Sequence, residues 1–117
     1  MMVSELTGPD RRHWDEAEGW LGLGLWAESL AEIEKITPEN QNHPDVLCCQ
    51  SRALMEAETW ELAAVAAYIL CNAVPDYPYA WIRLCYALYK SKQTETARKV
   101  LAGRISNFEG VILCRAW

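Results

Sequence analysis

The sequence predicts an all-α fold, an α-solenoid of antiparallel helix pairs, and three observations support this prediction. Trp26 recurs as Trp60 after 34 residues, and the same interval relates Ser29 to Ala63 and Ala97. About 34 residues is the length of one helix-turn-helix repeat. Apolar residues make up 51% of the 117 residues, enough for one domain of ordinary size. The repeat indicates stacked helix pairs rather than a single central core.

Other positions repeat at the same interval with side chains of similar size. These columns are Ala17, Ser51 and Cys85; Gly19, Ala53 and Ala87; Trp20, Leu54 and Leu88; Ile33, Ala67 and Leu101; and Pro44 with Pro78. Small residues allow two antiparallel helices to approach closely, while larger apolar residues one turn away fill the gaps on either side. We therefore expect these columns at the contacts between helices.

The first two helices are predicted from acidic residues, glycines and a proline. Residues 1–9 are expected to be irregular, and a helix is expected over about 10–21, with acidic residues near its positive end. Residues 22–24 then form a turn. A second helix over about 25–36 should end before Pro38, because the residue that precedes a proline avoids helical angles. Residues 39–43 are expected to form a loop.

Prolines mark the start of two further helices. Pro44 and Pro78 suit a first helical turn, where the missing amide hydrogen costs nothing, and Asn42 or His43 can cap the earlier of these helices. The sequence predicts helices over about 44–57, 59–73, 78–90 and 94–102, the last one ended by Gly103. The repeat domain would cover residues 10–107. The apolar segment 108–117 would be a capping helix or the start of a fourth repeat.

These features resemble those of tetratricopeptide repeats, with three repeats over about residues 10–104. The matching residues are the turn glycine Gly24, the aromatic residues Trp26 and Trp60, the small residues Ala63 and Ala97, the closing Pro75, and Trp81 with Leu84. The departures are Ser29 for alanine, the early Pro38, Cys85 for glycine, Thr94 for an aromatic residue and Glu109 for the closing proline. They put helix ends in question rather than the fold.

The resemblance implies a right-handed superhelix whose concave wall, built from the first helix of each repeat, binds a peptide or a partner helix. The corresponding wall residues here are Arg11, Trp14, Glu18, Arg52, Met55, Glu56, Tyr79, Tyr86 and Tyr89. Some members of the family hold a C-terminal carboxylate with lysines and asparagines on this wall. The equivalent positions hold Trp14, Cys48 and Ile82, then Glu18, Arg52 and Tyr86. The implied contacts are therefore aromatic and aliphatic, unless the tyrosines only cover the helices beneath them.

No sequence pattern indicates catalysis, a cofactor or a metal. The chain has only two histidines and no glycine-rich phosphate loop, so we expect no enzyme activity and no cofactor. Its five cysteines include no Cys-x-x-Cys pair and are expected to be small buried residues. His43, Cys48 and Cys49 could be combined into a zinc site, but their irregular spacing does not favour one.

The net charge of −5 is unevenly distributed along the chain. Residues 1–76 hold fourteen acidic and four basic residues, whereas residues 77–117 hold two acidic and seven basic ones. An acidic chain binds nucleic acid poorly at about 0.15 M salt, so a nucleic-acid partner is not expected. The sequence contains no secretory signal and no apolar run of membrane-spanning length, which predicts a cytoplasmic protein with no membrane contact.

Two classes of function stay open at this point. The first is an adaptor or chaperone-like module that binds a protein or peptide. The second is an assembly unit that associates end to end, with the apolar side chains of segment 108–117 contacting the acidic first repeat of another copy. Capping of the chain's own last helix by that segment is an alternative use of it. The chain would otherwise be a truncated member of a longer array.

Overall fold

All the regular secondary structure within residues 5–93 is helical. A computed structural model describes residues 5–93. Five α-helices follow one another, with one short 3-10 turn: α1 (Gly8–Gly22), α2 (Trp26–Ile33), η1 (Pro38–Asn40), α3 (Pro44–Glu56), α4 (Trp60–Ala73) and α5 (Pro78–Lys90). The predicted all-α class is confirmed over this range. The helix predicted at 94–102 and the segment 108–117 lie outside the described residues.

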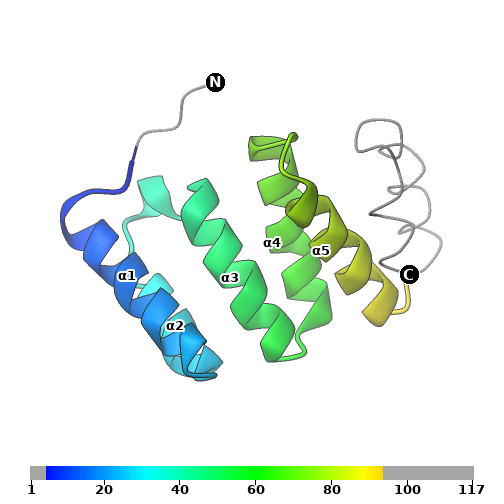
Figure 1. Ribbon diagram of the computed structural model, residues 1–117, viewed down its shortest axis with the longest axis horizontal. Helices are drawn as coiled ribbons and strands as arrows, with labels where there is room; N and C mark the ends of the chain where they lie inside the picture. The colour runs from blue at the N-terminus through cyan, green and yellow to red at the C-terminus, as the bar shows by residue number, and fades with distance from the viewer. Residues whose placement is uncertain (1–4, 94–117) are drawn as a thin grey trace.

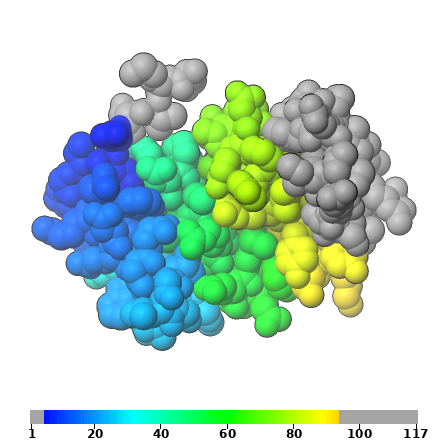
Figure 2. Space-filling view, viewed as in Figure 1, coloured from blue at the N-terminus to red at the C-terminus, as the bar shows by residue number. Residues whose placement is uncertain are grey.

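Successive helices pack against one another, and they follow in order across the molecule from α1 to α5 (Figure 1 and Figure 2). Three-residue connections at 23–25 and 57–59 join α1 to α2 and α3 to α4, so the two helices of each pair run in opposite directions. Helix α3 also contacts both α1 and α5. The helices α1, α3 and α5 therefore lie side by side in that order.

The apolar core consists of two clusters that share α3. The first joins α1, α2 and α3, and it includes Leu6, which is 5% exposed although it precedes the first helix. The second joins α3, α4 and α5 around Leu47, Leu70 and Leu84. Val46 and Leu47 are neighbours on α3, yet each belongs to a different cluster. Helix α3 thus contributes one face to each cluster.

The repeated small residues occupy buried positions where helices meet. Each of the following is at most 1% exposed: Ala17, Ser51 and Cys85; Ser29 and Ala63; Ile33 and Ala67; and Ala53 with Ala87. The first repeat departs from this pattern at two positions, because Gly19 is exposed and Trp20 is 37% exposed. The expectation that Trp20 fills an interhelical gap as Leu88 does is therefore wrong in part.

Two helix boundaries differ from the predicted ones for reasons that the structure makes plain. Helix α1 begins at Gly8, before the predicted start, because Pro9 fits its first turn. Helix α2 ends at Ile33 rather than near residue 36. The side-chain amide of Gln41 donates hydrogen bonds to the backbone carbonyls of Ile33 and Ile36, at 2.9 and 2.8 Å. The carbonyls that a longer helix would bond internally are satisfied in this way.

Asp10 fixes the start of α1 to the chain that follows α2. Its carboxylate accepts hydrogen bonds from the Thr37 hydroxyl (2.6 Å), the Asn40 side-chain amide (2.7 Å) and the Thr37 backbone N–H (3.0 Å). These bonds hold the pKa of Asp10 below its usual value, and those from the Thr37 hydroxyl and the Asn40 amide contribute most. Residues 37–40 are therefore part of the folded structure and not a free loop.

The turns that follow α1, α3 and α5 have one conformation, repeated every 34 residues. Each of these turns contains one residue with positive φ, which is Gly24 (+79°), Glu58 (+57°) or Lys92 (+68°). After α1, the Gly24 N–H bonds to the Leu21 carbonyl and the Leu25 N–H to the Trp20 carbonyl, both at 2.9 Å. The equivalent two bonds close the other turns, between 2.7 and 3.0 Å. This pair of hydrogen bonds is the Schellman motif. The backbone conformation therefore repeats at the same 34-residue interval as the sequence.

Glycine at position 58 should stabilise the protein, because Glu58 has a Cβ in the left-handed conformation that glycine adopts without strain. Glu58→Gly is expected to raise the free energy of unfolding by about 0.5–1 kcal/mol, measured by urea denaturation. Glu56→Gly, the control, replaces a residue in the right-handed helix and should lower it. Equal losses in both variants would contradict the turn assignment.

Candidate functional site

The nine residues predicted for the concave wall lie on the three helices that are side by side. Arg11, Trp14 and Glu18 are on α1, Arg52, Met55 and Glu56 on α3, and Tyr79, Tyr86 and Tyr89 on α5. None of them belongs to the fully buried core, and the tyrosines are between 38% and 60% exposed. We call these nine residues, together with Leu21, Cys48 and Arg83, the first-helix face.

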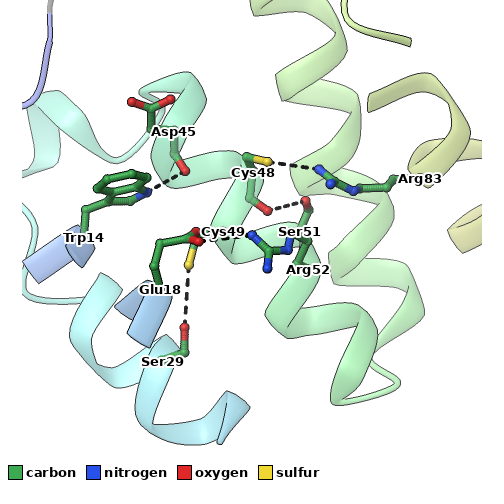
Figure 3. A network of polar contacts seen from close by, with 9 residues as sticks. All are labelled: Trp14, Glu18, Ser29, Asp45, Cys48, Cys49, Ser51, Arg52 and Arg83. Carbon is green, nitrogen blue, oxygen red and sulfur yellow. Dashed lines mark hydrogen bonds and ion pairs between the residues drawn. The ribbon is translucent and has the colours of Figure 1, made fainter. Parts of the chain in front are cut away.

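Polar contacts across the first-helix face join its helices, as Figure 3 shows. The Arg52 guanidinium forms an ion pair with the Glu18 carboxylate, with Nη1 3.2 Å from Oε1 and 3.4 Å from Oε2. The Trp14 indole N–H donates to the Asp45 backbone carbonyl at 3.0 Å. These two contacts connect α1 with α3. The side chains of Trp14 and Glu18 therefore point from α1 toward α3.

Arg83 makes the corresponding contact between α5 and α3. Its Nη1 lies 3.0 Å from Sγ of Cys48 (Figure 3). A thiol is a weak acceptor compared with a carboxylate. Within residues 5–93, Arg83 forms no ion pair with an acidic side chain. Its contacts are with the Cys48 thiol and the Tyr77 side chain, and the charge of the guanidinium is therefore not neutralised by a carboxylate of the described residues.

A shallow hollow lies where the three helices come together. It has a volume of about 290 Å³ and is lined by Leu21, Arg52, Met55, Glu56 and Arg83. Burial acts to lower the pKa of Arg52, but the ion pair with Glu18 outweighs this and raises it, so the guanidinium stays charged. The hollow is smaller than most small-molecule sites, which occupy about 300–1,000 Å³. Its size suits one or two side chains of a bound segment.

Two of the α5 tyrosines, Tyr79 and Tyr86, contact different aromatic partners. The Tyr79 ring meets Tyr77, with centroids 5.7 Å apart. The Tyr86 ring meets Trp60 of α4 edge to face at 5.6 Å, and the Lys90 ammonium lies 5.5 Å from the Trp60 centroid. The aromatic surface predicted for α5 thus extends onto α4 through Trp60. Sequence reasoning assigned Trp60 only to the repeat pattern.

A second exposed surface was not predicted. Trp20, Leu23, Leu25 and Trp26 lie at the turn between α1 and α2 and are between 37% and 73% exposed. We call these four residues the corner patch. Monomeric proteins rarely expose several large apolar side chains together, and such patches often mark contact sites. The sequence feature that could have predicted the corner patch is the pair of leucines beside Gly24, because turns usually carry polar residues.

The structure does not bring His43, Cys48 and Cys49 together as a metal site. Nδ1 of His43 accepts a hydrogen bond from the Asp45 backbone N–H at 3.1 Å, which confirms the predicted cap of α3. Cys49 is buried against Ser29, and burial raises the pKa of its thiol to about 12. Cys49, Cys71 and Cys85 are buried as expected, whereas Cys48 is half-buried on the first-helix face. Cys114 lies outside the described residues.

Comparison with known proteins assigns no family to this chain. No protein-family model, curated protein or solved structure matches it. Among the helices of residues 5–93, none combines the length and the apolar character that crossing a membrane requires. The interpretation of the first-helix face therefore depends on its own geometry and charge.

Proposed function

We propose that this protein is a protein–protein interaction module that binds a peptide segment or a partner helix on the first-helix face, without catalysis. In this proposal the helix pairs form a right-handed solenoid of the tetratricopeptide type, and the first-helix face is its concave wall. The observation that carries the proposal is the hollow in which Leu21 from α1, Met55 from α3 and Arg83 from α5 meet. A surface that draws on three helices is suited to an extended ligand.

The residues of the hollow define the chemistry of the expected partner. Arg83 contacts the Cys48 thiol and the Tyr77 side chain but has no carboxylate partner among the described residues, so a carboxylate of the partner would give it a stronger bond. Arg52 is already paired with Glu18, and Glu56 adds a negative charge to the lining, so Arg83 is the cation that stays available to a partner's carboxylate. Leu21 and Met55 offer apolar contact beside the two guanidinium groups. We therefore expect a partner segment that combines an acidic residue with large apolar residues.

Selection from a displayed library of random peptides tests this function directly. The selected peptides should be enriched in Asp or Glu next to large apolar residues. Arg83→Met keeps the length of the side chain but removes its charge. It should weaken the binding of these peptides by roughly ten- to hundred-fold, because a hydrogen bond to a charged group contributes about 1.5–3 kcal/mol. Tyr86→Ala should weaken binding by about 1–2 kcal/mol if this tyrosine is part of the site.

Arg12→Met is the matched control, because Arg12 is an exposed arginine of α1 outside the first-helix face. It should leave the affinity unchanged. A bound peptide should also protect the half-buried Cys48 from alkylation. Peptides that bind the Arg83→Met variant as tightly as the parent, or that leave Cys48 unprotected, would exclude the first-helix face as the binding site.

The corner patch favours a second function, association between copies of this chain. The contact would bury Trp20, Leu23, Leu25 and Trp26, and the apolar segment 108–117 of another copy is the contact partner suggested by the sequence. If so, the mass measured by light scattering should increase with protein concentration, and Leu23→Ser together with Trp26→Ser should reduce it to that of one chain. A mass of one chain at every concentration would rule out this function.

A further inference from the structure

Three metal-ligating side chains converge on the first helix pair, away from the first-helix face. His13 and Glu16 are three residues apart on α1, so they project from neighbouring positions of one helix surface. Glu32 approaches them from α2, with its Oε2 2.9 Å from Nδ1 of His13. One ligand atom of each residue lies within 4.8 Å of the other two. This is the only such group among the described residues.

The charges of this cluster attract a cation. Glu32 is only 8% exposed, and its two carboxyl oxygens face nitrogen groups of His13 and Lys35. The Lys35 ammonium lies 2.8 Å from Oε1 of Glu32 and supplies a positive charge. The Lys35 side chain is 57% exposed, so it can turn into solvent, and a bound metal ion would then replace its bond to Glu32. A metal ion could therefore take the place of the Lys35 ammonium beside Glu32.

We propose that His13, Glu16 and Glu32 bind a divalent transition-metal ion, and that Zn²⁺ fits the set best. Imidazole nitrogen and carboxylate oxygen are both ligands that Zn²⁺ accepts, whereas Ca²⁺ and Mg²⁺ prefer oxygen ligands alone. Three protein ligands leave the fourth tetrahedral position to a water molecule. Metal–ligand bonds of about 2.0–2.2 Å place tetrahedral ligand atoms about 3.4 Å apart, which small side-chain rotations can reach from the present spacing.

Metal binding at this place would join α1 to α2. The ion would bind the folded chain, in which the three ligands converge, more tightly than the unfolded chain, and so would stabilise the fold. The site shares no residue with the first-helix face. Its occupancy and peptide binding are therefore separate properties, and either can be present without the other.

The test is titration of the full chain with Zn²⁺, followed by thermal unfolding. At a Zn²⁺ concentration about 100 times the Kd, the Tm should rise on the order of 10 °C. His13→Gln and Glu16→Gln should each weaken binding by more than about 100-fold, since even outer-shell partners are worth about 10- to 100-fold. Lys35→Gln removes the competing ammonium and should tighten binding roughly tenfold. Glu28→Gln, which removes an exposed carboxylate of α2, should have no effect.

Co²⁺ serves as a spectroscopic probe of the ligands in the same variants. Co²⁺ bound by imidazole and carboxylates should show visible d–d bands without a thiolate-to-cobalt charge-transfer band. A thiolate band would place the ion on a cysteine instead and overturn the proposal. The absence of a Zn²⁺-dependent rise in Tm would also overturn it, as would equal affinity of the parent, the His13→Gln variant and the Lys35→Gln variant.

Discussion

The close approach of neighbouring helices at small buried residues is the constraint on which the rest of this structure depends. The hydroxyl of Ser29 on α2 and the thiol of Cys49 on α3 lie 3.6 Å apart, and both residues are fully buried. Ala17 and Ala63 are likewise inaccessible to solvent. A larger side chain at such a position would force helices apart, because protein interiors are packed to the density of organic crystals. The spacing of α1, α3 and α5, and with it the hollow between them, follows from these contacts.

Helix α3 and the repeated turns transmit this spacing along the chain. Because α3 packs in both apolar clusters, its position sets α1 on one side and α5 on the other. The Schellman turns at Gly24, Glu58 and Lys92 end α1, α3 and α5 with the same geometry. Helices α2 and α4 therefore begin after turns of the same geometry.

The sequence predicted the features that depend on side-chain size and on proline, and missed those that depend on contacts between distant residues. The columns that contain Ala63 and Ser51 were found because close helix packing requires small residues at a fixed interval. The start of α3 was found because Pro44 suits only a first turn. The predicted end of α2 was wrong because the true end depends on the side chain of Gln41. The conformation of the turn at Glu58 was not predicted because glycine is the residue type that usually indicates a positive φ.

The candidate sites show the same division. The helical register placed nine residues on the first-helix face, but it did not show that Arg83 contacts the Cys48 thiol, since that contact joins residues 35 positions apart. The cluster of His13, Glu16 and Glu32 escaped notice for the same reason, because Glu32 comes from another helix. The surface exposure of Trp20 was also hidden, since the repeat pattern alone treats equivalent positions as equally buried.

The most direct test of the packing constraint is the unfolding of a single enlarged variant. Ala63 is fully buried on α4, whereas Ala73 is exposed at the end of the same helix. Ala63→Leu should lower the free energy of unfolding in urea by about 1–3 kcal/mol, the typical cost of overpacking, while Ala73→Leu should change it by less than about 0.5 kcal/mol. An Ala63→Leu protein as stable as the parent would show that α4 does not pack closely at this residue, which would contradict the account.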